Sequence, residues 1–161
     1  MGNPKKCLIV LSSVYILAFI VNLIPSIMFP DATIQPIHAV ASGLLLVCMF
    51  GTCLLRNRVA KLLIMAILFA SVTVFTLISF ESYVYDIVLL DALFAIQYPL
   101  YILFVTPLFG LNYFLNVNPE YVALLVFFIA ILLLVIHELA VTRFDRIKPC
   151  AEVASRVVFK R

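Results

Sequence analysis

Residues 119–141 read PEYVALLVFFIAILLLVIHELAV, an apolar run whose only charged residues are Glu120 near its start and Glu138 near its end. A helix rises 1.5 Å per residue, so about 20 residues cross a hydrocarbon core about 30 Å thick. The preceding Asn118 suits an N-cap, Pro119 suits the first helical position, and Glu120 places an acid at the positive end of the helix dipole. The stretch therefore predicts a membrane-spanning helix that begins at Pro119.

The rest of the chain has the same character. Apolar residues make up 66% of the sequence and charged residues 12%, whereas an ordinary soluble domain is about half apolar and about a quarter charged. Further runs long enough to span a bilayer lie at residues 7–29, 36–55 and 62–80. We therefore predict an all-α, polytopic membrane protein, with one transmembrane domain over residues 1–142 and a basic tail over residues 143–161.

A fifth hydrophobic stretch, residues 87–110, is long enough to cross the membrane but contains Asp91, Gln97, Pro99 and Pro107. Two forms are open. The chain has either five full spans, or four spans and a re-entrant segment that enters and leaves the membrane on one side. A re-entrant segment is tolerated at membrane depth where protein surrounds it. In that form we expect the prolines to break the stretch into half-helices near Pro99.

The placement of the basic residues favours the re-entrant form. The eleven lysines and arginines fall in three groups: Lys5 and Lys6; Arg56, Arg58 and Lys61; and the tail from Arg143 to Arg161. The positive-inside rule places all three groups on the cytoplasmic side. This requires an even number of crossings between Lys61 and Arg143, whereas five full spans would export the basic tail.

Small residues predict how the helices pack, because close approach of backbones drives association in lipid. The small residues are Ala39, Gly43 and Gly51 on the second helix, and Ala66, Ala70 and Thr73 on the third. The short turn between these helices predicts that the two faces meet. On the last helix, Ala123, Ala130 and His137 recur every seven residues and predict a packing seam that faces protein.

The first helix carries a stripe of polar residues, which are Ser12, Tyr15, Asn22 and Ser26. Pro25 lies within the stripe and frees the carbonyl of Val21, so Asn22 could satisfy nearby backbone. We interpret the stripe as hydrogen-bonding groups that face other helices around a kink. The alternative is the wall of a polar cavity.

Polar and ionisable residues in or beside membrane segments are candidate functional residues. The candidates for binding a substrate or an ion are His38, Glu81, Asp86, Asp91, Gln97 and Asn22. The acids could bind a cation, relay protons or, with His38, hold a divalent metal. The alternative is a solvated acidic loop that obeys the orientation rule. We assign no metal ligand, no cofactor and no catalytic residue.

Three classes of function follow. We favour a non-enzymatic accessory or regulatory subunit that acts through helix–helix contacts and a basic cytoplasmic tail, because no reactive constellation is evident. The second class is a small oligomeric transporter or channel with a polar path near Asn22, Asp91 and Gln97. The third is a membrane-embedded enzyme that acts on a lipid or lipid-linked substrate through His38 and the acids near it.

The expected partners are the lipid bilayer and either other membrane subunits or further copies of this chain. The basic tail accounts for the net charge of +3, so nucleic-acid binding is not needed to explain it. We expect the tail to form a short amphipathic helix on the anionic inner leaflet, beginning near Pro149, or to dock a cytoplasmic partner.

Overall fold

The computed structural model describes residues 4–55, 57–81 and 94–158, and all regular secondary structure in this part of the chain is helical. The long helices are α1 (Pro4–Ile27), α2 (Pro36–Leu54), α3 (Arg58–Glu81) and α7 (Pro119–Val158). Between α3 and α7 lie α5 (Gln97–Leu100), the π-helix η1 (Tyr101–Val105), the 3₁₀-helix η2 (Thr106–Leu111) and α6 (Asn112–Leu115). We call this run of four short helices the 97–115 segment.

Five helical stretches are long and apolar enough to cross a membrane. They are Lys6–Ile27, Pro36–Leu54, Arg58–Phe80, Gln97–Leu115 and Pro119–Arg143. The predicted all-α, multi-pass fold is confirmed, and four of the predicted spans agree with the observed helices to within a few residues. The fifth stretch ends at Leu115, beyond the predicted end at residue 110, and residues 87–93 of the prediction are outside the described residues.

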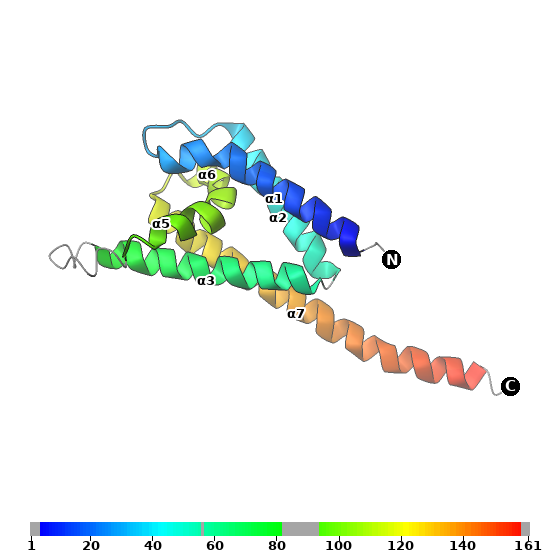
Figure 1. Ribbon diagram of the computed structural model, residues 1–161. Coiled ribbons are helices and arrows are strands. Elements are labelled where there is room, and N and C mark those ends of the chain that lie inside the picture. The colour runs from blue at the N-terminus through cyan, green and yellow to red at the C-terminus, as the bar shows by residue number, and fades with distance from the viewer. Residues whose placement is uncertain (1–3, 56, 82–93, 159–161) are drawn as a thin grey trace.

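The four long helices alternate in direction, so their termini gather at two opposite ends of the bundle (Figure 1). At one end α1 and α3 finish, and α2 and α7 begin; we call it the acidic end, because Asp31 and Glu120 lie there. The other we call the basic end, where the start of α3 carries Arg58 and Lys61. There Lys61 forms an ion pair with Glu138, which joins α3 to α7.

The long helices form two antiparallel pairs, α1 with α2 and α3 with α7 (Figure 1). Direct packing between the pairs is sparse, and the 97–115 segment lies between them. Its η2 part packs against α1 and α2, whereas its α5 and η1 parts pack against α3. The segment therefore holds the two pairs together.

Both ends of the 97–115 segment lie at the acidic end. Gln97 lines the same cavity as Ile78, near the end of α3, and Pro119, at the start of α7. Gly110 lies against the backbone of His38 in the first turn of α2. The segment thus enters and leaves at one end of the bundle, although it is long and apolar enough to span a membrane. This is the geometry of the re-entrant form.

The segment is broken into short helices as predicted, and residues 95 and 96 form a turn just before the helix that contains Pro99. Pro99 lies in the first turn of α5, where a backbone N–H has no helical partner to lose. A second distortion falls on η1 and η2, around Pro107. Pro107 has no N–H to donate to the carbonyl of Leu103, four residues earlier, and the hydroxyl of Tyr15 on α1 donates to that carbonyl.

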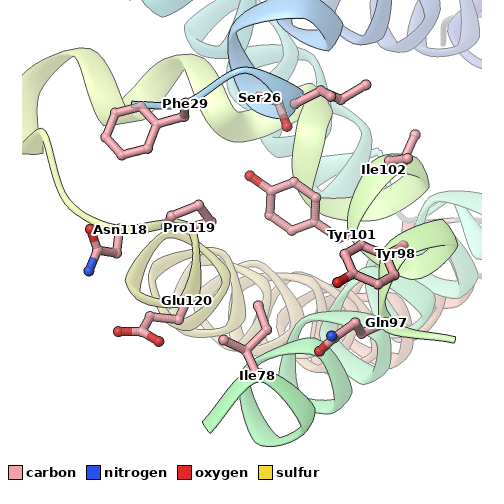
Figure 2. Close-up of a pocket in the computed structure, with 11 residues that line it drawn as sticks. Ser26, Phe29, Ile78, Gln97, Tyr98, Tyr101, Ile102, Asn118, Pro119 and Glu120 are labelled. Carbon is pink, nitrogen blue, oxygen red and sulfur yellow. The ribbon is translucent and has the colours of Figure 1, made fainter. Parts of the chain in front are cut away.

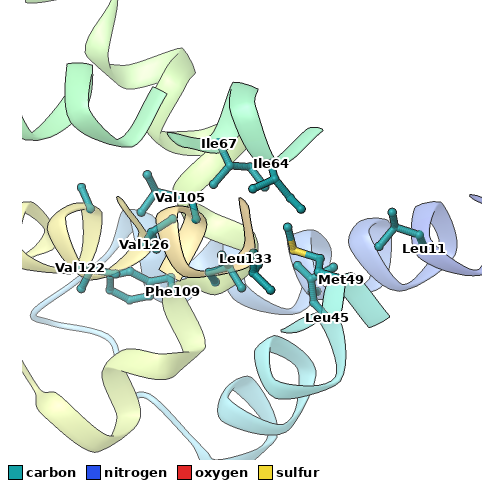
Figure 3. Packing of buried hydrophobic residues seen from close by; sticks show 14 of the residues in the cluster. Leu11, Leu45, Met49, Ile64, Ile67, Val105, Phe109, Val122, Val126 and Leu133 are labelled. Carbon is teal, nitrogen blue, oxygen red and sulfur yellow. The ribbon is translucent and has the colours of Figure 1, made fainter. Parts of the chain in front are cut away.

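The buried apolar core runs between α2, α3, α7 and the 97–115 segment (Figure 3). Phe109 and Val105 of the segment are fully buried and lie near Val122 and Val126 of α7. The predicted seam on α7 is confirmed as a buried face. Its members Ala123, Ala130 and His137 are 0%, 1% and 4% exposed.

The small-residue faces of α2 and α3 do not meet as predicted. A Cβ atom built on Gly43 or Gly51 would find nothing within 4 Å, so both glycines face away from the rest of the chain. The physical reason is competition for α3, which pairs along its length with α7 and contacts the 97–115 segment. The glycine face of α2 therefore remains uncovered.

Helix α7 runs past the basic end of the bundle without interruption, to Val158 (Figure 1). The prediction that a separate helix begins near Pro149 was wrong. A proline inside a helix removes one backbone hydrogen bond, and here the helix continues on both sides of Pro149. The basic tail is consequently an extension of the last spanning helix.

Candidate functional site

A buried polar cluster fastens the 97–115 segment to α1 and α2. Asn22 is fully buried, and its Nδ2 lies 2.9 Å from the carbonyl oxygen of Ala18, 3.1 Å from Ser42 Oγ and 3.2 Å from the carbonyl oxygen of Pro107. The Ser42 hydroxyl donates to the same Pro107 carbonyl at 3.0 Å. One carbonyl of the segment is thus held by a side chain from each helix of the first pair.

A third link lies one turn further along α1. Ser26 Oγ and Thr106 Oγ1 share a hydrogen bond of 2.8 Å, and both side chains are buried. We call Asn22, Ser26, Ser42, Thr106 and the Pro107 carbonyl the polar clamp. It supports the interpretation of the α1 stripe as a set of hydrogen-bonding groups, since Tyr15 also bonds the segment.

The prediction that Asn22 satisfies nearby backbone is confirmed by its bond to the carbonyl of Ala18. Pro25 frees the carbonyl of Val21, and the sequence suggested that Asn22 satisfies backbone near this kink. The amide donates to the carbonyl of Ala18, four residues earlier, and also across to that of Pro107. The sequence carried no signal for the second acceptor, which lies 85 positions away.

A cavity of about 390 Å³ opens beside the clamp at the acidic end (Figure 2). Its walls come from the end of α1, α3, the 97–115 segment and the start of α7. The lining residues are Ser26, Ile27, Phe29, Ile78, Gln97, Tyr98, Tyr101, Ile102, Asn118, Pro119 and Glu120. Polar groups are therefore set into a largely apolar wall.

Tyr101 is the central side chain of this cavity. Its hydroxyl points toward Ser26 (Figure 2), and this buried oxygen has no hydrogen-bond partner among the described residues. Its ring meets Phe109 edge to face, with the centroids 6.4 Å apart. Gln97, one turn earlier on the segment, is 2% exposed and lines the same cavity. The spacing of four residues between the two was the only sequence signal for Tyr101.

The predicted candidates fall in different places. Asn22 belongs to the polar clamp and Gln97 to the cavity, whereas His38 lines a separate hollow with Asp31 and Thr33. Within the described part of the chain, no three His, Cys, Asp or Glu residues lie close enough to hold a metal ion.

The remaining candidates stay predictions. Glu81 ends α3, but its side chain is not described, and Asp86 and Asp91 lie outside the described residues. The suggested path through Asn22, Asp91 and Gln97 is therefore untested, as is the pairing of His38 with these acids.

The length and apolar composition of its helices define the class of this chain, which is a small, polytopic helical membrane protein. Comparison with protein-family models, with curated proteins and with solved structures found no match.

Proposed function

We propose that this chain is a non-enzymatic accessory subunit that docks a transmembrane helix of a partner membrane protein against α2. The observation that carries the proposal is the uncovered glycine face of α2. Gly43 and Gly51 have open space where a side chain would point, and the neighbouring Val40 and Val47 are each 68% exposed.

Such a face is suited to a second helix. Lipid is as apolar as leucine, so helices in a membrane associate where small residues let backbones approach and pack closely. On α2 the valines form a ridge beside two hollows left by the glycines. A single helix of the partner can fill both hollows, because Gly43 and Gly51 are eight residues apart and lie within one quarter of the helix circumference.

The cationic extension of α7 also supports a protein partner, because it offers a second surface that the partner can contact. It projects from the end of the bundle at which α2 finishes (Figure 1). Residues 142–161 contain six Lys and Arg but only two acids, Asp145 and Glu152. A partner with a helix on α2 and an acidic region beside the membrane would complement both surfaces.

The polar clamp supports this class over a transport path. Asn22 is fully buried, and its amide hydrogens are directed at acceptors within the chain. The amide hydrogens thus fix the 97–115 segment, while the Oδ1 atom of Asn22 has no hydrogen-bond partner among the described residues.

The test is co-purification of the tagged chain from its native membranes in a maltoside detergent. We expect a partner of fixed stoichiometry whose recovery falls roughly tenfold in Gly43→Leu, because leucine fills the hollow that receives the partner helix. Ser13→Leu is the matched control, since Ser13 is exposed on α1, away from this face. Its recovery of the partner should equal that of the wild type.

Two outcomes would overturn the proposal. One is a partner recovered equally with both variants. The other is a second copy of this chain as the sole protein whose recovery depends on Gly43. Thermal unfolding of each purified variant establishes that the bundle itself is intact.

A further inference from the structure

We propose that the cavity at the acidic end is a binding site for a lipophilic organic cation, a molecule with an ammonium group on an apolar body. This inference is independent of the docking face on α2. It rests on the shape of the cavity, its aromatic wall and the charge of the end of the bundle at which it opens.

The cavity can take the apolar body of such a ligand. Its volume of about 390 Å³ falls in the range of about 300–1,000 Å³ that is usual for small-molecule sites. The side chains of Phe29, Ile78 and Ile102 supply apolar wall from three different parts of the fold. The apolar body of a ligand placed there would be removed from the water at the mouth of the cavity.

The aromatic residues suit the ammonium group. Tyr98 lines the cavity and is 58% exposed, and the ring of Tyr101 stands across the cavity from Phe29 (Figure 2). The face of an aromatic ring attracts a cation, and quaternary ammonium groups are commonly bound by several such rings. The buried Tyr101 hydroxyl, which lacks a partner in the described part of the chain, is available to a polar group of the ligand.

The charge of the residues around the cavity favours a cation over an anion as the ligand. Glu120 lines the cavity, in the first turn of α7. The sequence has no Lys or Arg from Leu62 to Thr142 or from Cys7 to Leu55, which together include every described element at this end. A carboxylate at the start of a helix also interacts favourably with the helix dipole, but this interaction supplies no cation to pair with the carboxylate. An ammonium group at the mouth would provide one.

The cation could be a lipid of the bilayer that carries an ammonium group, or a dissolved lipophilic amine. Both share the same recognition chemistry. Mass spectrometry of lipids retained by the purified protein tests the first source, and an added soluble probe tests the second.

The probe is octyltrimethylammonium, titrated calorimetrically into the protein in maltoside micelles, with empty micelles as the blank. We expect saturable binding at one site. Tetramethylammonium, which lacks the apolar body, should bind at least roughly tenfold more weakly. Octyl sulfate, which has the same chain and the opposite charge, should show no saturable binding.

Variants locate the site. Glu120→Gln should weaken binding of octyltrimethylammonium roughly tenfold by removing the charge, whereas Asp31→Asn, at the same end but lining another hollow, should leave it unchanged. Ile78→Trp should abolish binding by filling the cavity. Leu132→Trp is its control, because Leu132 is 58% exposed on α7 and does not line the cavity.

The proposal is wrong if octyl sulfate binds as tightly as octyltrimethylammonium, or if Ile78→Trp binds like the wild type. Equal binding by Glu120→Gln and wild type would also overturn the assignment of a cation. If Glu120→Gln does not fold, Ile78→Trp and the octyl sulfate comparison still decide. None of these variants changes the glycine face of α2, so failure here is distinguishable from failure of the accessory function.

Discussion

At the scale of single residues, Gly110 shows how closely the 97–115 segment approaches α2. A Cβ atom at this position would lie 1.9 Å from the carbonyl oxygen of His38 and 2.7 Å from Ser42 Oγ. Backbone atoms of a helix cannot move aside as a flexible side chain can. Glycine is therefore required at position 110, because any side chain there would collide with the backbone of α2. Gly43, which is part of α2 itself, has no such contact.

We expect Gly110→Ala to lower the free energy of unfolding by about 1–3 kcal/mol, or more, because the added methyl group forces η2 away from α2. Gly43→Ala is the matched control. It adds the same methyl group in open space and should be neutral or stabilising, by up to about 1 kcal/mol, through helix propensity. Unfolding of both variants in mixed micelles measures the difference, and equal effects would contradict the close approach at Gly110.

The sequence was informative about which polar residues are unusual and uninformative about what they contact. Asn22 and Gln97 were singled out because polar side chains are unfavourable in a membrane, and the structure buries both, at 0% and 2% exposure. Their surroundings depend on how the 97–115 segment folds back. Hydropathy is a local property of the sequence, so it does not indicate how the 97–115 segment folds back against α1 and α2.

At the scale of elements, the spans were predictable because length and apolar content are read directly from the chain. The prolines indicated that the fifth stretch is broken, and Pro99 and Pro107 each stand in the first turn of a short helix, α5 and η2. The π-helical and 3₁₀ conformations between and after them had no signal in the sequence. The pairing of α2 with α3 failed for a different reason, since α3 packs chiefly against α7 and the 97–115 segment and contacts α2 little.

The re-entrant geometry predicts which positions share one side of the membrane. In a chain whose four native cysteines are replaced by serine, Asp31→Cys and Asn118→Cys should react with an impermeant thiol reagent from the same side. Both residues are at the acidic end, one before α2 and the other before α7. Arg58→Cys, at the start of α3, should react only from the opposite side.

Labelling of Asn118→Cys together with Arg58→Cys would instead establish a fifth crossing. Such a result would mean that the 97–115 segment crosses the bilayer, for which its length and hydropathy are sufficient. Residue 118 is the deciding position, because the two forms place it on opposite sides.

At the scale of the whole molecule, two helix pairs diverge from the acidic end and the 97–115 segment fills the space between them there (Figure 1). The long extension of α7 leaves from the other end. The positive-inside rule predicts that this basic end, with the start of α1 and the extension, faces the cytoplasm.

We therefore expect Cys150 to be protected from an impermeant thiol reagent in intact cells and to become reactive once the membrane is opened. Cys7, Cys48 and Cys53 are first replaced by serine, so that the signal comes from position 150 alone. Reaction of Cys150 in intact cells would contradict the form with four spans and a re-entrant segment, because five full spans would export the basic tail.

The polar clamp also has a consequence for biogenesis. The carbonyls of Leu103 and Pro107 are satisfied by Tyr15, Asn22 and Ser42, side chains of helices that are synthesised earlier. In lipid alone the carbonyl of Leu103, which Pro107 cannot bond, would be unsatisfied, at a cost of several kcal/mol. The nascent chain is thus expected to pair α1 with α2 before the 97–115 segment can leave the insertion machinery, so the order of synthesis is also the order of assembly.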